Sequence, residues 1–295
     1  MVPSGKKWIV GLDLGPRSAG ALRFATWIAR PSQAGGERLI GIHVLEEAHL
    51  HVALRYHHLA ELEARALDTA RASIAQHGAA DVMDAHVVEG KTADQTLEAA
   101  CMFHHGYALV IGRNAPRDSA NPVRLGRVAR RILRSLDEPV IVVPPDLPDA
   151  GSGAVVLALS GADDAAGAAE FARDFATRFG RELVLAHVAP LPEHHSAQYL
   201  PPETLAKIRG ENQANGEREL AGWAEQLGLA AVRRVVLQGG VTDQLVAFAA
   251  SERALALVTG SRRLSVFERW LLASTGSDVA ANAGCPVAVV PATRA

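Results

Sequence analysis

The sequence predicts an α/β protein in which two tandem five-stranded, doubly wound parallel sheets of the Rossmann-like type follow one another. Short runs rich in valine, isoleucine and leucine alternate with longer segments of helical period, which is typical of repeated strand–helix units around a buried parallel sheet. The same series of segments then occurs a second time. A length of 295 residues also suits two domains of ordinary size.

The repeat keeps its register through the whole of each half. The matched segments are Trp8–Asp13 with Val155–Ser160, Val87–Gly90 with Val236–Gly239, Ala108–Gly112 with Ala256–Gly260, and Pro139–Pro144 with Pro286–Pro291. Between the halves, residues 144–153 combine prolines with glycines, the usual composition of a linker. We therefore divide the chain into domains of residues 1–147 and 148–295.

The first half is predicted to contain five strands joined by four helices. The strands are expected at 7–13, 38–45, 83–89, 107–112 and 139–143, and the helices at 17–30, 55–77, 93–105 and 126–135. The apolar run Trp8–Val10 indicates the first strand, and Phe24 and Ala25 lie at helical spacing after it. The second strand is another aliphatic run, and leucines spaced among charges indicate the long second helix.

The later elements follow the same logic. After the third strand, Thr92 offers a hydroxyl at the expected N-cap of a helix whose apolar side includes Leu97 and Cys101. The fourth strand is an aliphatic run that ends at Gly112, and arginines alternate with apolar residues in the last helix. The last strand is bounded by prolines, and the second half repeats this order.

Composition excludes several classes of protein. The formal net charge is -2 and the pI is near 6.6, whereas general nucleic-acid binders carry a strongly basic face. The two cysteines, Cys101 and Cys285, cannot form a disulfide framework and lack zinc-type spacing, so we expect a buried thiol at Cys285 and a reducing compartment. The first apolar run meets Asp13 too soon for a signal peptide or membrane span. We therefore expect a cytoplasmic protein with no nucleic-acid or membrane partner.

Two strand ends are the first candidates for ligand binding. In an open parallel sheet, ligands bind beyond the carboxyl ends of the strands, where the winding direction reverses. The first strand ends at Asp13, whose carboxylate can accept hydrogen bonds from a base or a sugar, and the fourth ends at Gly112, where a phosphate can approach the backbone. An aspartate after a strand also commonly serves as a turn or cap residue, and this alternative stays open.

In this order, the features resemble the universal stress protein family in its tandem form. The resemblance rests on Asp13, the His43-Val44 and His187-Val188 strand ends, the Glu89–Gln95 and Gln238–Gln244 segments, and the terminal Pro-Val-x-Val-Val-Pro strands. It implies a strand order of 3-2-1-4-5 in each half and an intramolecular pseudo-dimer formed through the last strands. It further implies a non-catalytic, stress-linked binding or regulatory module that holds ATP or AMP with Mg²⁺, with Val44 among the cofactor-binding residues. A further homodimer and an unidentified protein partner are also expected.

The ATP-binding branch of that family carries a loop of pattern G-x2-G-x9-G-(S/T), from which both halves depart. The first half keeps Gly112 and Gly126, but Ala115 replaces the middle glycine and Arg127 replaces the hydroxyl residue. In the second half, the loop begins with Gly260, Ser261 and Arg262 and ends with Ser274 and Thr275. Its second and third glycines are replaced by Arg263 and Ala273, and the position of Asp13 is taken by Ser160. A nucleotide site is therefore expected in the first half more than in the second, and a chain with no cofactor is the alternative.

Arginines are concentrated in the first-half loop and the helix after it. Residues 113–134 contain seven arginines and one acid, Asp118. We expect Arg113 and Arg127 to hold phosphates by charge-assisted hydrogen bonds, beside the positive end of a helix that begins near Gly126. The alternative is a solvated helix face paired with acids such as Glu46, Asp137 or Glu138.

Two other functions remain open at this point. One is a pure interaction scaffold with both pockets closed. The other is a weak ATP-hydrolysing or pyrophosphatase-type enzyme, because Ser160–Asp164 partly resembles the S-G-G-x-D-S loop of ATP pyrophosphatases, without its second glycine and final serine. No catalytic residue is assigned. No metal site is assigned either, since adjacent histidines on a helix point in different directions.

Overall fold

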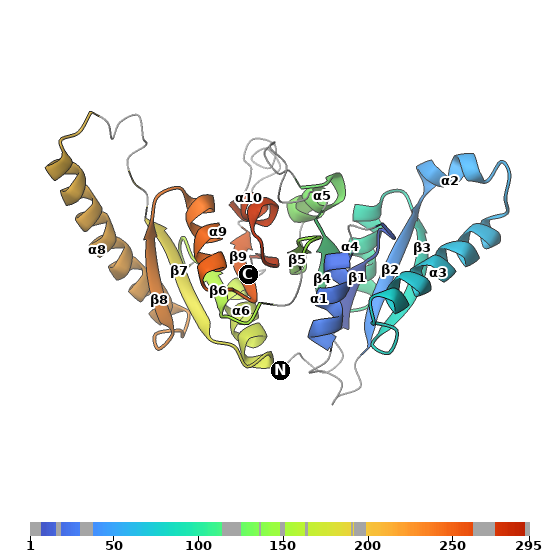
Figure 1. The fold of residues 1–295 in the computed structure, drawn as a ribbon, viewed down its shortest axis with the longest axis horizontal. Coiled ribbons are helices and arrows are strands. Elements are labelled where there is room, and N and C mark those ends of the chain that lie inside the picture. The colour runs from blue at the N-terminus through green and yellow to red at the C-terminus, as the bar shows by residue number, and fades with distance from the viewer. Residues whose placement is uncertain are drawn as a thin grey trace. The chain divides into compact units, whose positions relative to one another are not determined.

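The computed structural model describes residues 7–15, 19–29, 38–113, 125–135, 137–147, 151–162, 165–189, 191, 199–261 and 275–292. The chain forms two compact units, Met1–Ala150 and Gly151–Ala295 (Figure 1). Composition alone predicted the boundary between residues 147 and 148. Each unit is a parallel sheet with helices, which confirms the predicted α/β fold in two tandem copies.

The first unit has the strand order β3-β2-β1-β4-β5, and its neighbouring strands are parallel. Its strands are β1 (Lys7–Gly11), β2 (Leu39–Glu46), β3 (Met83–Gly90), β4 (Gly106–Gly112) and β5 (Val140–Val143). Its helices are α1 (Ala19–Ala29), α2 (Glu47–Ala53), α3 (Leu59–Gln76), α4 (Ala93–Phe103) and α5 (Arg127–Ser135). The winding direction therefore reverses between β1 and β4, as the predicted order requires.

The second unit repeats this arrangement as β8-β7-β6-β9-β10. Its strands are β6 (Val155–Ala158), β7 (Leu183–Ala189), β8 (Arg233–Gln238), β9 (Ala256–Ser261) and β10 (Val287–Pro291). Its described helices are α6 (Ala166–Arg178), α8 (Pro202–Gln226), α9 (Val241–Ser251) and α10 (Thr275–Asn282). The repeat seen in the sequence is thus also a repeat of the fold.

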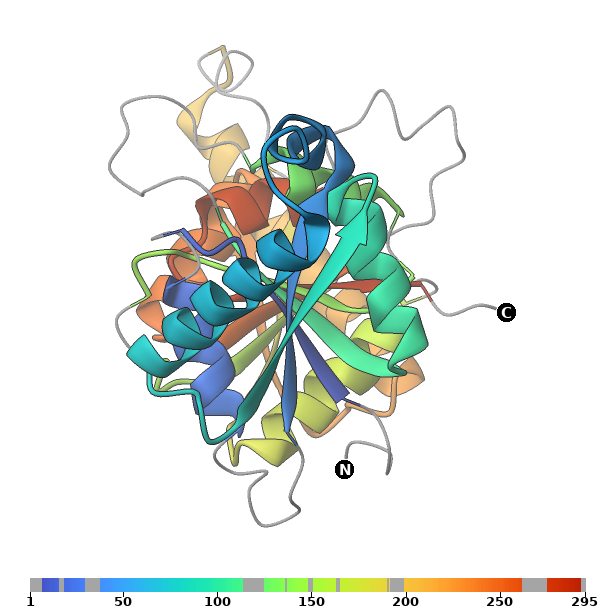
Figure 2. The ribbon, with the colours of Figure 1, turned by 90° about the vertical axis from the view of Figure 1, so that its right-hand side faces the viewer.

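The central strands of the first unit are buried on both faces. Ile9, Val10, Val110 and Ile141 have no exposed surface, because helices cover both sides of the sheet. In Figure 2, which faces the first unit, α1 and α3 lie on one side of the strands and α4 lies on the other. This burial explains why the strands appear in the sequence as continuous apolar runs rather than as alternating ones.

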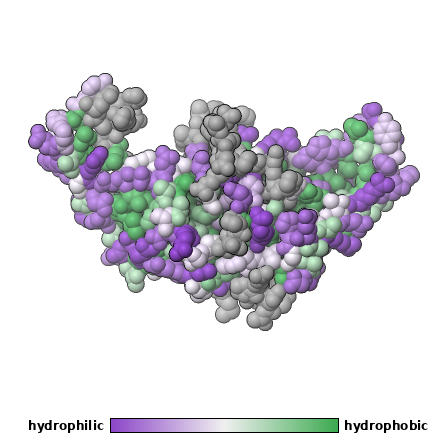
Figure 3. All heavy atoms as spheres, viewed as in Figure 1, coloured by the Kyte–Doolittle hydropathy of each residue, from purple (hydrophilic) through white to green (hydrophobic). Residues whose placement is uncertain are grey.

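The long helices α3 and α8 pack on the sheets of their units through narrow stripes of buried residues. α3 buries Ala70 and Ile74, and α8 buries Gly216, Leu220 and Ala224. The remaining surface along both helices is largely hydrophilic (Figure 3). These helices therefore cover the sheet with one face and present charges to solvent with the other.

Three predicted boundaries were wrong by several residues. The helix expected at 55–77 begins at Leu59, and residues 47–53 form the separate helix α2. Between them, His58 is extended, with φ -77° and ψ 145°. β1 ends at Gly11 because Leu14 turns the chain with φ 57°, and α4 ends at Phe103, before His105 with φ 51°.

The two outer strand pairs carry the same ion pair with the charges exchanged. In the first unit, Arg38 before β2 lies 2.8 Å from Asp84 on β3. In the second unit, Glu182 before β7 lies 2.9 Å from Arg233 on β8. Both pairs are about half exposed, so each stabilises its unit by about 1 kcal/mol at most. The exchange keeps the attraction at this corner of the fold although the residues differ.

Candidate ligand-binding site in the first unit

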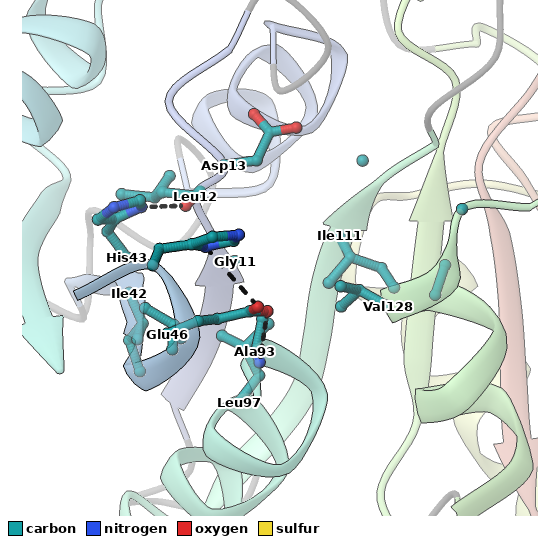
Figure 4. Close-up of a pocket in the computed structure, with 15 residues that line it drawn as sticks. Gly11, Leu12, Asp13, Ile42, His43, Glu46, Ala93, Leu97, Ile111 and Val128 are labelled. Carbon is teal, nitrogen blue, oxygen red and sulfur yellow. Dashed lines mark hydrogen bonds and ion pairs between the residues drawn. The ribbon is translucent and has the colours of Figure 1, made fainter. Parts of the chain in front are cut away.

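A cavity of about 280 Å³ lies beyond the carboxyl ends of β1, β2 and β4 (Figure 4). It is lined at the ends of these strands by Gly11, Leu12, Asp13, Ile42, His43, Val44, Glu46, Ile111 and Gly112. The helices add His49 of α2, Ala93 and Leu97 of α4, and Val128 and Ala129 of α5, together with Gly126 just before α5. The cavity therefore lies at the reversal of winding between β1 and β4, where open α/β sheets bind their ligands.

Four residues predicted from the sequence converge on this cavity. Asp13, Val44, Gly112 and Gly126 come from four separate segments, and all of them line it. They meet because the carboxyl ends of parallel strands lie at one edge of the sheet. The strand ends chosen from the sequence thus lie together at this cavity, and their role in binding a ligand stays a prediction.

The two arginines predicted as phosphate contacts are placed differently from each other. Arg127 begins α5 at the edge of the cavity, and its side chain is 63% exposed. Arg113 is 1% exposed, does not line the cavity, and donates its backbone N–H to the Val143 carbonyl oxygen over 2.8 Å. The structure thus places Arg113 in the protein interior and leaves Arg127 beside the cavity.

The candidates in the second unit lie at the matching strand end. Gly260 and Ser261 end β9, and Thr275 begins α10, whereas Arg262 and Ser274 lie outside the described residues. Here α8 packs directly on the neighbouring strand end. A Cβ added at Gly216 of α8 would lie 2.9 Å from Val236 Cγ1 and 3.3 Å from His187 Cδ2.

The two matching histidines illustrate the difference between the units. His187 is 8% exposed, and its ring meets that of Trp223 on α8 at a centroid distance of 5.0 Å. His43 is half-buried and lines the cavity. Both are hydrogen-bonded through Nδ1. His43 donates to the Leu12 carbonyl oxygen at 2.8 Å, and His187 donates to the Leu159 carbonyl oxygen at 2.9 Å. In the neutral form, Nε2 of each ring is then an acceptor.

Asp13 serves as a turn residue and also lines the cavity. Its Oδ1 accepts the N–H of Gly15 at 2.9 Å, which is the turn role that the sequence left open. The carboxylate is exposed, and Oδ2 makes no hydrogen bond within the part of the chain that the structure describes. One oxygen therefore orders the turn while the other remains open to a ligand.

Val44 lines the cavity and brings its peptide groups to it. Leu12 donates its N–H to the Ile42 carbonyl oxygen at 2.8 Å, and β1 has ended at Gly11. Because the direction of hydrogen bonding alternates along a strand, the peptide groups of Val44 point the same way as those of Ile42, past the end of β1. The N–H and C=O of Val44 thus give the cavity one donor and one acceptor side by side.

Glu46 lines the cavity, although the sequence suggested it only as a partner for arginines. Its side chain is 12% exposed and reaches into the cavity, where Oε1 accepts the N–H of Ala93 at 3.0 Å (Figure 4). Its Oε2 lies 3.6 Å from Nη2 of Arg127 and 3.9 Å from Nδ1 of His49. A carboxylate is thereby fixed at the positive N-terminus of α4.

Glu46 also corrects the predicted helix cap. Thr92 occupies the N-cap of α4 in an extended conformation, but its side chain makes no capping hydrogen bond. Its buried Oγ1 has no hydrogen-bond partner within the described residues. The cap comes instead from a residue on β2, and no local sequence pattern reports such a long-range contact.

The exposed face of α5 is basic, and the acids that the structure describes neutralise it only in part. It carries Arg127, Arg130, Arg131 and Arg134 at helical spacing. Arg127 pairs with Glu46, as the alternative interpretation foresaw, and Arg131 lies 3.3 Å from Asp94. Positive charge therefore remains along the helix that leaves the cavity.

We expect Glu46→Ala to lower the free energy of unfolding by about 1–2 kcal/mol, because the first turn of α4 loses its cap. Thr92→Val should leave it unchanged or slightly higher, since it removes a buried hydroxyl that has no partner in the described structure. Urea unfolding followed by circular dichroism measures both. An equal loss in the two variants would contradict this assignment of the cap.

Other kinds of site were sought across the described residues. They contain no group of three or more histidine, cysteine or acidic side chains placed to hold a metal ion. None of the helices in this part of the chain is long and apolar enough to cross a membrane. The histidine pair at 194–195 lies outside the described residues.

Comparisons with known proteins agree with this fold. A family model described as "Universal stress protein family" matches residues 5–144 and again residues 152–291. A universal stress protein from Archaeoglobus fulgidus superposes with a TM-score of 0.65 at 18% identity, covering 98% of this chain and 99% of its own. A Pseudomonas aeruginosa protein of unknown function gives a TM-score of 0.64 at 16% identity, covering 98% and 93%. No curated protein matches the chain.

Proposed function

Because the chain belongs to the universal stress protein family, we propose that it is a non-catalytic, stress-linked binding module whose first unit holds a nucleotide. The family resemblance suggests ATP or AMP as the ligand, with Mg²⁺ carried on the phosphates. The observation that supports this proposal is the cavity of about 280 Å³ at the reversal of winding, lined by Asp13 and Val44. Its volume is near the lower end of the range for small-molecule sites, about 300 Å³.

The lining residues fit the three parts of a nucleotide. The apolar side chains of Leu97, Ile111 and Val128 offer flat contact to a base. The N–H and C=O of Val44 can pair with a base edge, and Oδ2 of Asp13 can accept from a sugar hydroxyl. The phosphates would lie toward Gly112 and the N-terminus of α5, where backbone donors and the helix dipole favour negative charge.

Arg127 is suited to assist the phosphates. Its contact with Glu46 is 3.6 Å long and its side chain is 63% exposed, so breaking the pair costs less than about 1 kcal/mol. A phosphate offers the guanidinium a stronger charge-assisted hydrogen bond. Arg127 would therefore turn from Glu46 to the ligand.

The same geometry disfavours the two competing functions. An open cavity in the first unit argues against a scaffold with both pockets closed. Two of the cavity's possible acid or base groups are already used in positioning, because His43 holds Leu12 and Glu46 holds Ala93. Burial, with a smaller contribution from Glu138, raises the pKa of the Cys101 thiol to about 12, which makes it a poor nucleophile. These contacts support a role in holding a ligand rather than transforming it.

Other features of the proposal concern assembly and location. The intramolecular pseudo-dimer, a further homodimer, an unidentified protein partner and a cytoplasmic location all follow from the family resemblance and the composition. Each of them stays a prediction.

The test is to purify the protein gently, denature it and identify any released small molecule by mass spectrometry. We expect one nucleotide per chain from the wild type and loss of that nucleotide from Asp13→Ala and Arg127→Glu. Arg130→Glu is the matched control, since it makes the same charge change on the same helix without touching the cavity. A protein that releases nothing, and whose Tm does not rise on adding purine nucleotides, would instead support the scaffold.

A further inference from the structure

We infer that Glu46 makes the first-unit cavity selective for guanine over adenine nucleotides. This inference rests on the proposed nucleotide site, and it assigns guanine to that site in place of the adenine that the family resemblance suggests. It starts from an unusual feature of the cavity, which is that two of its lining side chains, Asp13 and Glu46, are carboxylates.

Glu46 is held where a base would bind. Side chains alternate along a strand, so Ile42, Val44 and Glu46 share one face of β2, and all three line the cavity. Two residues of strand separate Glu46 from Val44 by roughly 7 Å, which is the scale of a purine edge. The carboxylate is 12% exposed and is tethered to the N–H of Ala93. It cannot leave the cavity without uncapping α4.

The hydrogen-bonding character of Glu46 determines which base edge fits. An ionised carboxylate only accepts hydrogen bonds, and it can accept two parallel ones. Guanine presents two adjacent donors, N1–H and the 2-amino group, next to the acceptor O6. The N–H of Val44 can donate to O6 while the Glu46 carboxylate accepts from N1–H and from the 2-amino group.

Adenine does not satisfy the same set of groups. Its 6-amino group and N1 can pair with the C=O and N–H of Val44, but this edge offers no further donor to Glu46. On binding adenine, the carboxylate would lose water and gain no hydrogen bond from the base, keeping only the Ala93 N–H as its hydrogen-bond partner, which is costly for a charged group that is mostly buried. One hydrogen bond to a charged group can make binding roughly ten- to hundredfold tighter, so the base that forms this bond is preferred by that factor in affinity.

The experiment measures dissociation constants of the full-length chain for GDP, ADP and IDP by isothermal titration calorimetry. The three ligands share their phosphates and sugar, and IDP differs from GDP only by lacking the 2-amino group. We expect GDP to bind at least about tenfold more tightly than ADP and more tightly than IDP. In Glu46→Gln the side-chain amide still offers one oxygen to cap α4, but it faces the 2-amino group with a donor. The preference for GDP over IDP should therefore disappear.

Glu47→Gln is the matched control, because it removes the same charge one residue later, at a position that does not line the cavity. It should bind the three nucleotides as the wild type does. If ADP binds as tightly as GDP, the inference is wrong while the proposed function stands. If Glu46→Gln keeps the wild-type preference for GDP, the assignment to Glu46 is wrong. If none of the three nucleotides binds, both the inference and the proposed function fail.

Discussion

Gly20→Ala is expected to lower the free energy of unfolding by about 3 kcal/mol or more. A Cβ built on Gly20 would lie 1.9 Å from the Pro144 carbonyl oxygen and 2.9 Å from the Pro144 carbonyl carbon. Both are backbone atoms at the end of β5, so no flexible side chain can move aside. The same helix also holds the following residues, because Arg23 donates to the carbonyl oxygens of Pro145 and Leu147 at 3.0 and 2.8 Å. Forcing α1 away would disturb all of these contacts.

The sign of this effect makes the measurement decisive. On helix propensity alone, replacing glycine by alanine inside a helix stabilises it by roughly 1 kcal/mol. Gly222→Ala in α8 is the control that should follow that rule, since an added Cβ there meets nothing within 4 Å. Urea unfolding monitored by circular dichroism compares the two variants. A Gly20→Ala protein as stable as the wild type would show that α1 does not approach β5 this closely.

The fold was predictable because it depends on patterns that repeat along the chain. Strands buried on both faces need continuous apolar runs, and their helices need apolar residues at helical spacing, so both signals are local. The break between α2 and α3 was missed because leucines such as Leu50 and Leu54 continue the helical pattern through it. Periodicity reports which face is apolar, and it is insensitive to a single turn of non-helical backbone.

The candidate site was predictable only where topology determines it. Asp13, Val44, Gly112 and Gly126 meet because parallel strands place their carboxyl ends at one edge, which a strand assignment already implies. The hydrogen bond from the Ala93 N–H to Glu46 joins α4 to β2 across 47 positions of sequence. Neither helix propensity nor a local motif could reveal this cap. Arg113 shows the opposite case. It was expected to hold phosphates beside Arg127, yet the structure buries it away from the cavity.

The second unit shows how packing adds to what a loop motif predicts. Its altered loop and Ser160 already made a nucleotide site less expected there than in the first unit. The structure adds that α8 lies directly on the strand end, where Gly216 and Trp223 contact His187. Nothing in the repeated strand sequence distinguishes His187 from His43, since the difference comes from the helix packed above it.

Val128→Trp is expected to abolish nucleotide binding by the first unit. Val128 lines the cavity from the second residue of α5, and an indole ring would take up much of its volume of about 280 Å³. A nucleotide that had to displace the ring would lose about 3 kcal/mol of binding free energy, which is roughly a hundredfold loss of affinity. Titration of the variant with GDP and with ADP measures this loss for either base.

Arg130→Trp is the control for this prediction, because it places the same ring on the exposed face of α5. It should retain wild-type affinity, since Arg130 does not line the cavity. The ligand-free Tm separates blocking from misfolding. A tryptophan that fills an existing cavity adds apolar contact, so Val128→Trp without ligand should melt at or above the wild-type temperature. A lowered Tm together with lost binding would mean that the ring distorts α5 instead. Unchanged binding with an unchanged Tm would move the nucleotide site away from this cavity altogether.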